Sequence, residues 1–557
     1  MSNTQSTDKD DILSFVEASK GFFHTTGCQI RESEHGGLGV FALKNLKEET
    51  VLLRVPKASV FSAENSSIAN LLVDSDIKGI LALQLAFIYE VFVFGAESHW
   101  YKYLKSIKHK QNGKLYLPPA YWDDEEKKLL NKTALDKVFQ ALSPQEEIED
   151  GFTVGLTLAK KWRQDFGLQI PTLFDFDTED PIQASSNLKE FAAIVFAISS
   201  RVFEIDNYHD SGLVAIADLF NHDTTSPDVR FESVYDVCEL CGEMGDCRHV
   251  IAEMRLLDMK MEQAVNKENG HAPRETGTIS NSVIEELEKE LNSSETQQTN
   301  DAKVEESSED DTEETPEKKM PANIDPDECV DIALANDVEA GEEIFNSYGD
   351  HSNAYLLARY GFCVPDNPHD VVDLSDELLE YIQQNSSRFG ERMEWWEDEL
   401  HTMFKEWFLA TREEDEDEDG DNDEEEEKEE EEEEEEEIDQ EMEEIDEEGE
   451  DDQADSRGFV YLEYSGKPNE ILLAIINLLT MTPSAYKSLS AARGDAEKLA
   501  KRLPLLEGKL SGDGKRLLKR ISAAKKYAKL PPKLDTYTLQ QIGILVSCEK
   551  QILDRVR

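Results

Sequence analysis

The chain has 557 residues, of which 39% are hydrophobic and 32% are charged, and its formal net charge is −64. This length allows two to four domains, and the apolar share is large enough for real hydrophobic cores. The negative charge argues against a direct nucleic-acid ligand and favours basic protein partners. Seven cysteines are too few for a disulfide framework and indicate a reducing compartment.

The N-terminal part carries neither a signal peptide nor a membrane span by its sequence. It begins MSNTQSTDKDD, which is polar and acidic, and we interpret residues 1–25 as an N-terminal segment whose amphipathic pattern over 11–25 predicts a helix. The longest apolar run, Ile80 to Ala96, contains Gln84 and Glu90 and falls short of the ~20 residues that a bilayer requires. We therefore expect a protein of the nucleus, the cytoplasm or both, with no membrane association.

A β-rich stretch extends from Gln29 to Ser59 and contains the sequence GGLGVFA at Gly36–Ala42. Its glycines would let the backbone approach a ligand closely, although an ordinary hairpin is the simpler interpretation. No helix opens after a G-x-G-x-x-G pattern here, so the stretch is not a dinucleotide-binding motif.

Helical patterns follow over residues 68–165 and 188–204. The second ends in Ser200-Arg201-Val202-Phe203. Arg201 stands at the end of an apolar helix, where it is either a partner of the helix dipole or a ligand for an anion.

Leu213–Asp223 reads LVAIADLFNHD, an apolar run that is interrupted by Asp218, Asn221 and His222. Polar groups in such a segment need partners. They are either a cap and a satisfied core histidine, or the lining of a ligand pocket.

A cluster of metal-ligating residue types follows a predicted strand at Val229–Tyr235. Cys238, Cys241, Cys247 and His249 have the spacing C-x2-C-x5-C-x-H. Thiolates and imidazole at this spacing could hold a structural zinc ion in tetrahedral geometry, and free thiols in a loop are the alternative. Four protein ligands leave no open position, so we do not expect a catalytic zinc.

The region from about 262 to 327 is polar, and we predict that it is a disordered insertion. Strand character returns at Val330–Leu334 and leads into the segment Gly341–Cys363. In that segment Tyr348 and Tyr360 each precede a glycine, a place where a backbone can approach a ligand. A turn with two core aromatics is the plain alternative.

The C-terminal part is helical by pattern but is interrupted by a strongly acidic tract. Residues 413–455 contain 33 Asp or Glu and a single Lys, which is half of the net charge of the chain. Such a tract cannot bury apolar surface, and we expect it to be disordered. The last part of the chain, from Lys487 to Arg557, is basic.

Three motifs in this order, GGLGVFA, then SRVF with LVAIADLFNHD, then GEEIFNSYG with RYGF, resemble the SET domain in the branch typified by the plant rubisco large-subunit lysine methyltransferase. Among relatives, the fungal ribosomal-protein lysine methyltransferases look most similar. The resemblance implies an α+β protein in which a β-rich SET fold is split by a helical insertion and followed by an all-helical substrate-binding domain. The implied division is a SET domain over 26–350 with the helical insertion at about 70–205, a following helical domain over 351–412 and 457–557, and the acidic tract over 413–456.

The resemblance also implies S-adenosylmethionine as methyl donor and a protein lysine as acceptor. Tyr348 would be the catalytic residue, and Asp218, Tyr348 and Tyr360 would line the channel for the target lysine. The implied cofactor-binding residues are Gly37, Leu38, Gly39, Arg201, Asn221, His222, Tyr348, Tyr360 and Phe362. The family usually has proline where Ala215 stands and asparagine where Asp228 stands.

The resemblance therefore implies a protein-lysine methyltransferase that acts on a basic protein, such as a ribosomal protein of the large subunit, and we expect it to be a monomer. An elongation factor, a histone or a histidine side chain remain alternative acceptors. A non-catalytic acidic binding protein on a SET scaffold is the alternative outside enzymes.

Overall fold

The computed structural model describes residues 2–245, 247–252, 254–256, 325–416 and 460–556. These residues form two compact units, one of Met1–Leu117 with Glu146–Gly349 and one of Pro118–Gln145 with Asp350–Arg557. The predicted insertion 262–327 and the acidic tract 413–456 lie outside the described residues except at their ends. Residues 118–145, which we placed in the helical insertion, belong to the second unit.

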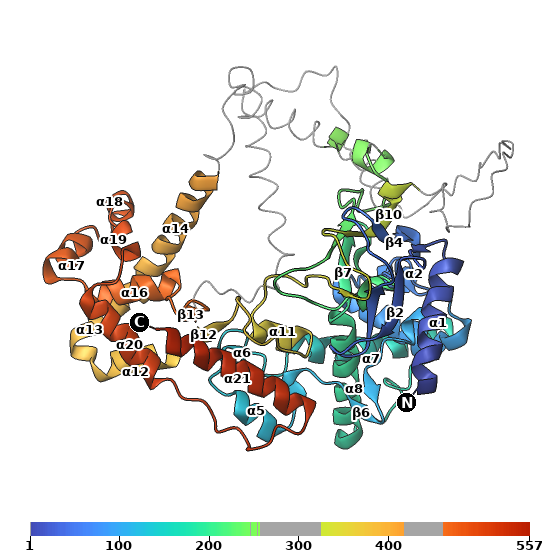
Figure 1. Ribbon diagram of the computed structural model, residues 1–557, viewed down its shortest axis with the longest axis horizontal. Helices are drawn as coiled ribbons and strands as arrows, with labels where there is room; N and C mark the ends of the chain where they lie inside the picture. Colours follow the sequence, from blue (N-terminus) through green and yellow to red (C-terminus); the bar gives the residue numbers. More distant parts are fainter. Residues whose placement is uncertain (1, 246, 253, 257–324, 417–459, 557) are drawn as a thin grey trace. The chain divides into compact units, whose positions relative to one another are not determined.

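The first unit combines short strands with helices (Figure 1). Its strands are β1 (Phe22–Phe23), β2 (Cys28–Glu32), β3 (Leu38–Ala42), β4 (Val51–Pro56), β5 (Lys110–Gln111), β6 (Lys114–Leu115), β7 (Val202–Asp206), β8 (Asp210–Leu213), β9 (Val229–Ser233), β10 (Cys329–Leu334) and β11 (Glu343–Ile344). Its α-helices are α1 (Ser2–Ala18), α2 (Ala69–Val73), α3 (Gly79–Tyr89), α4 (Tyr101–Leu104), α7 (Glu146–Phe166) and α8 (Pro181–Ser199). Its other helical turns are η1 (Lys57–Ser59), η2 (Glu90–Phe94), η3 (Gly95–Glu97), η5 (Ala217–Leu219) and η6 (Pro326–Glu328).

Strand β10 is the centre of the larger sheet, whose order is β1-β4-β10-β9. All six residues of its sequence CVDIAL are buried, and it pairs antiparallel with both neighbours. The strand predicted at Val330–Leu334 is therefore confirmed. Asp331 is the polar residue of this strand, and it lies opposite Arg54 of β4 and accepts a hydrogen bond from Arg54 Nε at 2.8 Å. The ion pair satisfies a carboxylate that would otherwise be costly to bury.

The smaller sheet has the order β11-β3-β2. Strands β2 and β3 form the predicted hairpin, with Cys28 opposite Ala42. Strand β11 pairs with β3 through Glu343 and Ile344, which lie opposite Phe41 and Val40. This pairing carries the chain that leads to Tyr348 past the glycine-rich hairpin.

The predicted N-terminal helix is shorter at its C-terminal end than the apolar pattern suggested. Helix α1 ends at Ala18, and Phe22 and Phe23 pair with β4 as strand β1. Lys20 has a φ of +61°, and a Cβ on Gly21 would lie 2.8 Å from Val16 Cγ1. The tight turn ends the helix there, because pairing with β4 outweighs the local helical pattern.

The apolar segment after α2 is helical, as predicted, and consists of α3, η2 and η3 in succession. Over Gly79–Glu97 it is long and apolar enough, by length and composition, to cross a membrane, and half of its most apolar window is buried inside the protein. Leu83, Phe87 and Ile88 are almost fully buried. A core helix meets the same criteria, so this feature alone is weak support for a membrane span.

The second unit is built from helices with one small sheet of β12 (Val371–Asp373) and β13 (Tyr461–Glu463). Its helices are η4 (Pro119–Tyr121), α5 (Asp124–Leu130), α6 (Ala134–Lys137), α11 (Asn353–Arg359), α12 (Ser375–Gln384), α13 (Ser386–Trp395), η7 (Trp396–Leu400), α14 (His401–Glu416), α16 (Glu470–Thr480), α17 (Pro483–Ser490), α18 (Ala496–Ala500), α19 (Pro504–Glu507), α20 (Gly512–Ala524) and α21 (Tyr537–Arg555). One of its cores gathers around α16, and another joins α6 and α11 to α21. The helices predicted at Ile471–Leu479 and Leu539–Leu553 are both present.

Candidate active site

The LVAIADLFNHD motif follows β8 through a strained turn. Ile216 has a φ of +76°, a left-handed conformation that a β-branched residue rarely adopts. Its side chain is fully buried, so the surrounding packing holds the turn in place. The turn leads into η5, which carries Asp218, and Asn221 and His222 follow directly.

Two segments that are far apart in the sequence run side by side at this point. Asn346 N donates a hydrogen bond to Asn221 O at 2.8 Å, and Asp223 N donates to Asn346 O at 2.9 Å. His222 and Asn346 form an isolated parallel bridge. The backbone therefore fixes the Asn-His pair against the segment that ends in Tyr348.

Asp228 supports the same segment from the side. Its Oδ2 accepts a hydrogen bond from Phe345 N at 2.9 Å. Burial raises the pKa of Asp228, and the hydrogen bond from Phe345 opposes this rise. The side-chain oxygen of an asparagine can accept the same bond, so the departure from the family pattern at this position preserves the contact.

Tyr348 makes three contacts with the LVAIADLFNHD motif. Its backbone N–H donates to His222 Nδ1 at 3.0 Å, and its ring stacks on the imidazole with centroids 5.1 Å apart. Its hydroxyl donates to Phe220 O at 3.0 Å. Because Nδ1 accepts a bond, a neutral His222 carries its proton on Nε2, which lies 3.0 Å from Thr224 Oγ1. The phenol therefore has a defined position and a defined direction for its proton.

The glycine-rich hairpin is tied to this motif by a glutamate. Glu343 Oε1 accepts a hydrogen bond from Asn221 Nδ2 at 2.7 Å, and its Oε2 accepts one from Ser33 Oγ at 2.9 Å. A Cβ on Gly39 would collide with Glu343 Oε1 and would lie 3.1 Å from Asn221 Nδ2. A side chain at position 39 would therefore have to displace the Glu343 carboxylate from its place beside Asn221. Gly37 has a φ of +67° with open space at its Cβ position.

Glu343 and Ser33 were not among the predicted site residues. The only signal in the sequence was the charged pair in GEEIFNSYG next to a short apolar run. The partners of Glu343 lie 122 and 310 residues away, so the sequence pattern could not show that this carboxylate joins the two motifs.

Arg201 and Asp218 form a second polar group in the same unit. Arg201 Nε lies 3.8 Å from Asp218 Oδ2, and the Arg201 side chain is 36% exposed whereas that of Asp218 is 2% exposed. Arg201 Nη1 also donates to Ser200 Oγ at 3.0 Å. Burial raises the pKa of Asp218 to about 6, and the charge of Arg201 and the Tyr103 hydroxyl oppose this rise. A half-exposed guanidinium at the end of α8 can bind a carboxylate from solution.

Tyr360 and Phe362 belong to the second unit. They follow α11 on either side of Gly361, which has a φ of +82°, and their ring centroids are 6.2 Å apart. Burial raises the pKa of Tyr360. Their assignment to the cofactor and the lysine channel stays a prediction.

The four predicted metal ligands come together in the first unit. The ligand atoms of Cys238, Cys241, Cys247 and His249 all lie within 4.8 Å of one another. The cluster is distinct in sequence from the motifs that surround Tyr348.

One known protein resembles the chain over its whole length, and two others resemble it over a short segment. It is 40% identical to Ribosomal lysine N-methyltransferase 3 of Saccharomyces cerevisiae over an alignment of 578 residues, which covers 100% of this chain and 99% of the relative. Ribosomal lysine N-methyltransferase 2 of the same yeast is 48% identical over 44 residues, 8% of this chain and 9% of that protein. Ribosomal lysine N-methyltransferase set10 of Schizosaccharomyces pombe is 54% identical over 37 residues, 7% of each chain. No protein-family model matches the sequence.

Solved structures are more distant. The SET domain of LSMT bound to lysine and AdoHcy covers 99% of this chain and 90% of its own, with 16% identity and a TM-score of 0.49. Rubisco LSMT bound to AdoMet has the same coverage, 15% identity and a TM-score of 0.47.

Proposed function

This chain belongs to the ribosomal lysine N-methyltransferase family, and from that premise we propose that it methylates a lysine side chain on a protein of the large ribosomal subunit. The observation that carries the proposal is the 40% identity over the full length of both chains with the yeast enzyme. Similarity over only part of the chain would leave the activity open, but this alignment includes both the N-terminal and the C-terminal parts of the two proteins. The reaction uses S-adenosylmethionine as methyl donor.

The residues around Tyr348 fit this methyl donor. We infer that the backbone of Gly37, Leu38 and Gly39 and of the Asn221-His222 pair would hold it, since open space at Gly37 lets a ligand approach the backbone. Arg201 offers a guanidinium fork for the methionyl carboxylate. When bound, S-adenosylmethionine supplies an electrophilic methyl group on its sulfonium.

Tyr348 is suited to position a methyl group rather than to exchange a proton. Its hydroxyl proton points to the Phe220 carbonyl oxygen, and a phenol oxygen engaged in this way can still accept weak C–H···O bonds, each worth about 0.5–1 kcal/mol. The lysine must be neutral to attack, and an apolar environment lowers the pKa of a lysine by desolvation. Alignment of the reacting groups supplies the larger part of the rate, up to roughly 7–11 kcal/mol in favourable cases.

The charge of the chain supports a basic protein as acceptor. The net charge of −64 would attract lysine-rich proteins, and ribosomal proteins are of this class. Attraction of this kind increases the rate of encounter and does not decide which lysine is modified.

The test is methyl transfer to separated ribosomal subunits. Subunits are prepared from cells that lack the methylation and are incubated with the purified protein and labelled S-adenosylmethionine, followed by mass spectrometry of the labelled band. We expect methyl-lysine on one protein of the large subunit. Label confined to proteins of the small subunit would overturn the proposed acceptor. No label on any protein, with active donor present, would overturn the proposed reaction.

A further inference from the structure

A cluster of three cysteines and a histidine lies between β9 and the end of the described part of this region. Neither the methyl transfer nor the residues around Tyr348 involve it. We propose that Cys238, Cys241, Cys247 and His249 bind one structural zinc ion, which fixes residues 237–252 to the first unit.

The distances within the cluster match tetrahedral coordination. Cys238 Sγ lies 3.6 Å from His249 Nδ1. A zinc ion with Zn–S of about 2.3 Å and Zn–N of about 2.0–2.1 Å holds such a sulfur and nitrogen roughly 3.6 Å apart at tetrahedral angles. Since all four ligand atoms lie within 4.8 Å of one another, one ion can reach each of them after small side-chain movements. Three thiolates and one imidazole in a closed set are typical of structural zinc.

The backbone around the cysteines supports coordination. Cys241 N and Gly242 N both donate to Cys238 O, at 3.2 Å and 2.7 Å, and Gly242 has a φ of +71°. This turn brings the first two sulfurs together. Val250 N lies 3.5 Å from Cys247 Sγ, in position to donate to a thiolate and to offset part of its charge.

His249 is oriented by its neighbour. Arg248 Nε donates to His249 Nε2 at 3.1 Å, so Nδ1 is the nitrogen that faces Cys238. A metal on Nδ1 places the ring proton on Nε2, and the exposed Arg248 side chain must then turn away. Within the described residues, the contact that competes with metal binding comes from the long side chain of Arg248, which lies at the surface.

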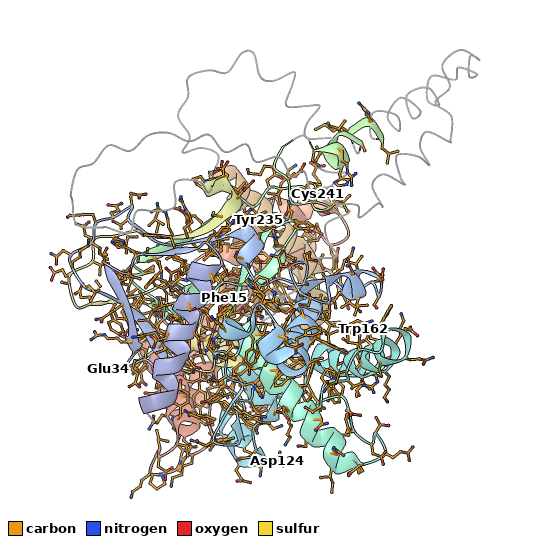
Figure 2. All side chains as sticks on the ribbon, turned by 90° about the vertical axis from the view of Figure 1, so that its right-hand side faces the viewer. Phe15, Glu34, Asp124, Trp162, Tyr235 and Cys241 are labelled. Atoms are coloured by element: carbon orange, nitrogen blue, oxygen red, sulfur yellow. The ribbon has the colours of Figure 1, made fainter. Side chains whose placement is uncertain are left out.

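The cluster sits against the β7–β8 hairpin of the same unit. A Cβ on Gly242 would lie 2.8 Å from Tyr208 Cδ1, so the turn packs directly on the Tyr208 ring. Val237 and Ala252 on either side are buried. Cys241 is labelled in Figure 2, near the short helical stretch of residues 248–252. A zinc ion held by the four ligands would add to the stability of this region.

The first experiment uses the full-length wild-type protein. It is purified under reducing conditions and its zinc content is measured by mass spectrometry of the metal. The zinc is then exchanged for Co²⁺ and the visible spectrum is recorded. We expect one equivalent of zinc and the thiolate charge-transfer and d–d bands of tetrahedral Co²⁺. A protein that carries no zinc and acquires no such spectrum with added Co²⁺ would overturn the proposal.

Matched variants assign the ligands. Cys241→Ser and Cys247→Ser should each lose the bound zinc and lower the melting temperature. Cys329→Ser is the control, because Cys329 is a buried cysteine of β10 whose Sγ contacts Asp325 O at 3.3 Å, a hydrogen bond that a serine hydroxyl can keep. It should retain one equivalent of zinc. Full zinc content in both cluster variants would contradict the assignment of these cysteines as ligands. If a variant does not fold, the Co²⁺ spectrum of the wild-type protein still tests whether the cluster binds a metal.

Discussion

At the scale of single residues, hydrogen bonds and a ring stack restrict the side chains of the candidate site. Tyr348 is fixed by His222 through a hydrogen bond and a ring stack, and its hydroxyl is directed at Phe220 O. Asn221 is held by Glu343, which also binds Ser33. These contacts fix the positions of Tyr348 and Asn221 within the protein itself, and the proposed methyl transfer would draw on such pre-organisation.

We predict that Tyr348→Phe keeps the fold and loses activity. Phenylalanine retains the backbone hydrogen bond to His222 and the ring stack, but it lacks the oxygen that would contact a methyl group. The turnover number should fall by about 10- to 100-fold, while binding of S-adenosylmethionine, measured by calorimetry, should change little. Turnover equal to the wild type would remove Tyr348 from the catalytic role.

We predict that Glu343→Ala weakens donor binding. The substitution removes the acceptor that the Asn221 amide and the Ser33 hydroxyl share. Both groups are partly buried, so the loss costs up to about 1–3 kcal/mol. The dissociation constant for S-adenosylmethionine should rise by about tenfold or more. Glu339→Ala is the matched control, because Glu339 is an exposed acidic residue of the preceding turn. Equal affinity in the two variants would show that Glu343 does not position the motif.

At the scale of secondary structure, the pattern of apolar residues is sufficient to predict an element whose position is decided by burial alone. Val330–Leu334 was predicted as a strand because it is continuously apolar apart from Asp331, and it is the buried centre of its sheet. Phe22 and Phe23 were predicted as helix and are strand β1, because pairing with β4 is a tertiary interaction that local periodicity does not contain.

The same limit applies to the site. The resemblance implied that Asn221, His222 and Tyr348 act together. The structure brings His222 into contact with Tyr348, and Asn221 into contact with Glu343 of the segment that leads to Tyr348. The Phe220 carbonyl and the Glu343 carboxylate could not be predicted, since their roles depend on the register of segments more than a hundred residues apart.

Within the second unit, Glu549 on α21 makes stability depend on pH. It is fully buried, its Oε1 accepts a hydrogen bond from Ala134 N at 2.8 Å, and burial raises its pKa from 4.5 to about 8. The folded state therefore holds this proton over a range in which the unfolded chain has lost it. The free energy of unfolding contributed by this group is largest below pH 4.5 and declines as the pH rises to about 8, with a slope of at most about 1.4 kcal/mol per pH unit.

We predict that Glu549→Gln removes most of this pH dependence. Glutamine keeps an oxygen for Ala134 N and cannot ionise, so the variant should be more stable than the wild type near pH 8. Urea unfolding between pH 5 and pH 8 measures the difference. Glu380→Gln, at an exposed position of α12, should follow the wild-type curve. If the free energy of unfolding changes with pH in the same way in the wild type and in Glu549→Gln, the pH dependence does not come from Glu549.

At the scale of the whole molecule, the distribution of charge is the dominant feature. Half of the net charge lies in residues 413–455, and a basic acceptor would be attracted to it at long range. Since ions screen charges beyond about 8–10 Å at physiological salt, this contribution should depend strongly on ionic strength.

We predict that replacing residues 413–455 by a Gly/Ser linker of equal length lowers kcat/KM for a basic protein substrate by up to about tenfold at low salt. The difference should vanish at high salt, and activity on a short neutral peptide that carries the target lysine should be unaffected. A higher activity in the replaced protein would instead show that the tract inhibits the enzyme.

The proposed activity is tested most directly by the mass of each ribosomal protein from cells in which the gene for this chain has been deleted. We expect that one protein of the large subunit lacks one or more methyl groups on a lysine. The wild-type gene should restore them, and the gene encoding Tyr348→Phe should restore a smaller fraction of them. Ribosomal proteins with unchanged masses in the deletion strain would show that this chain does not methylate the ribosome.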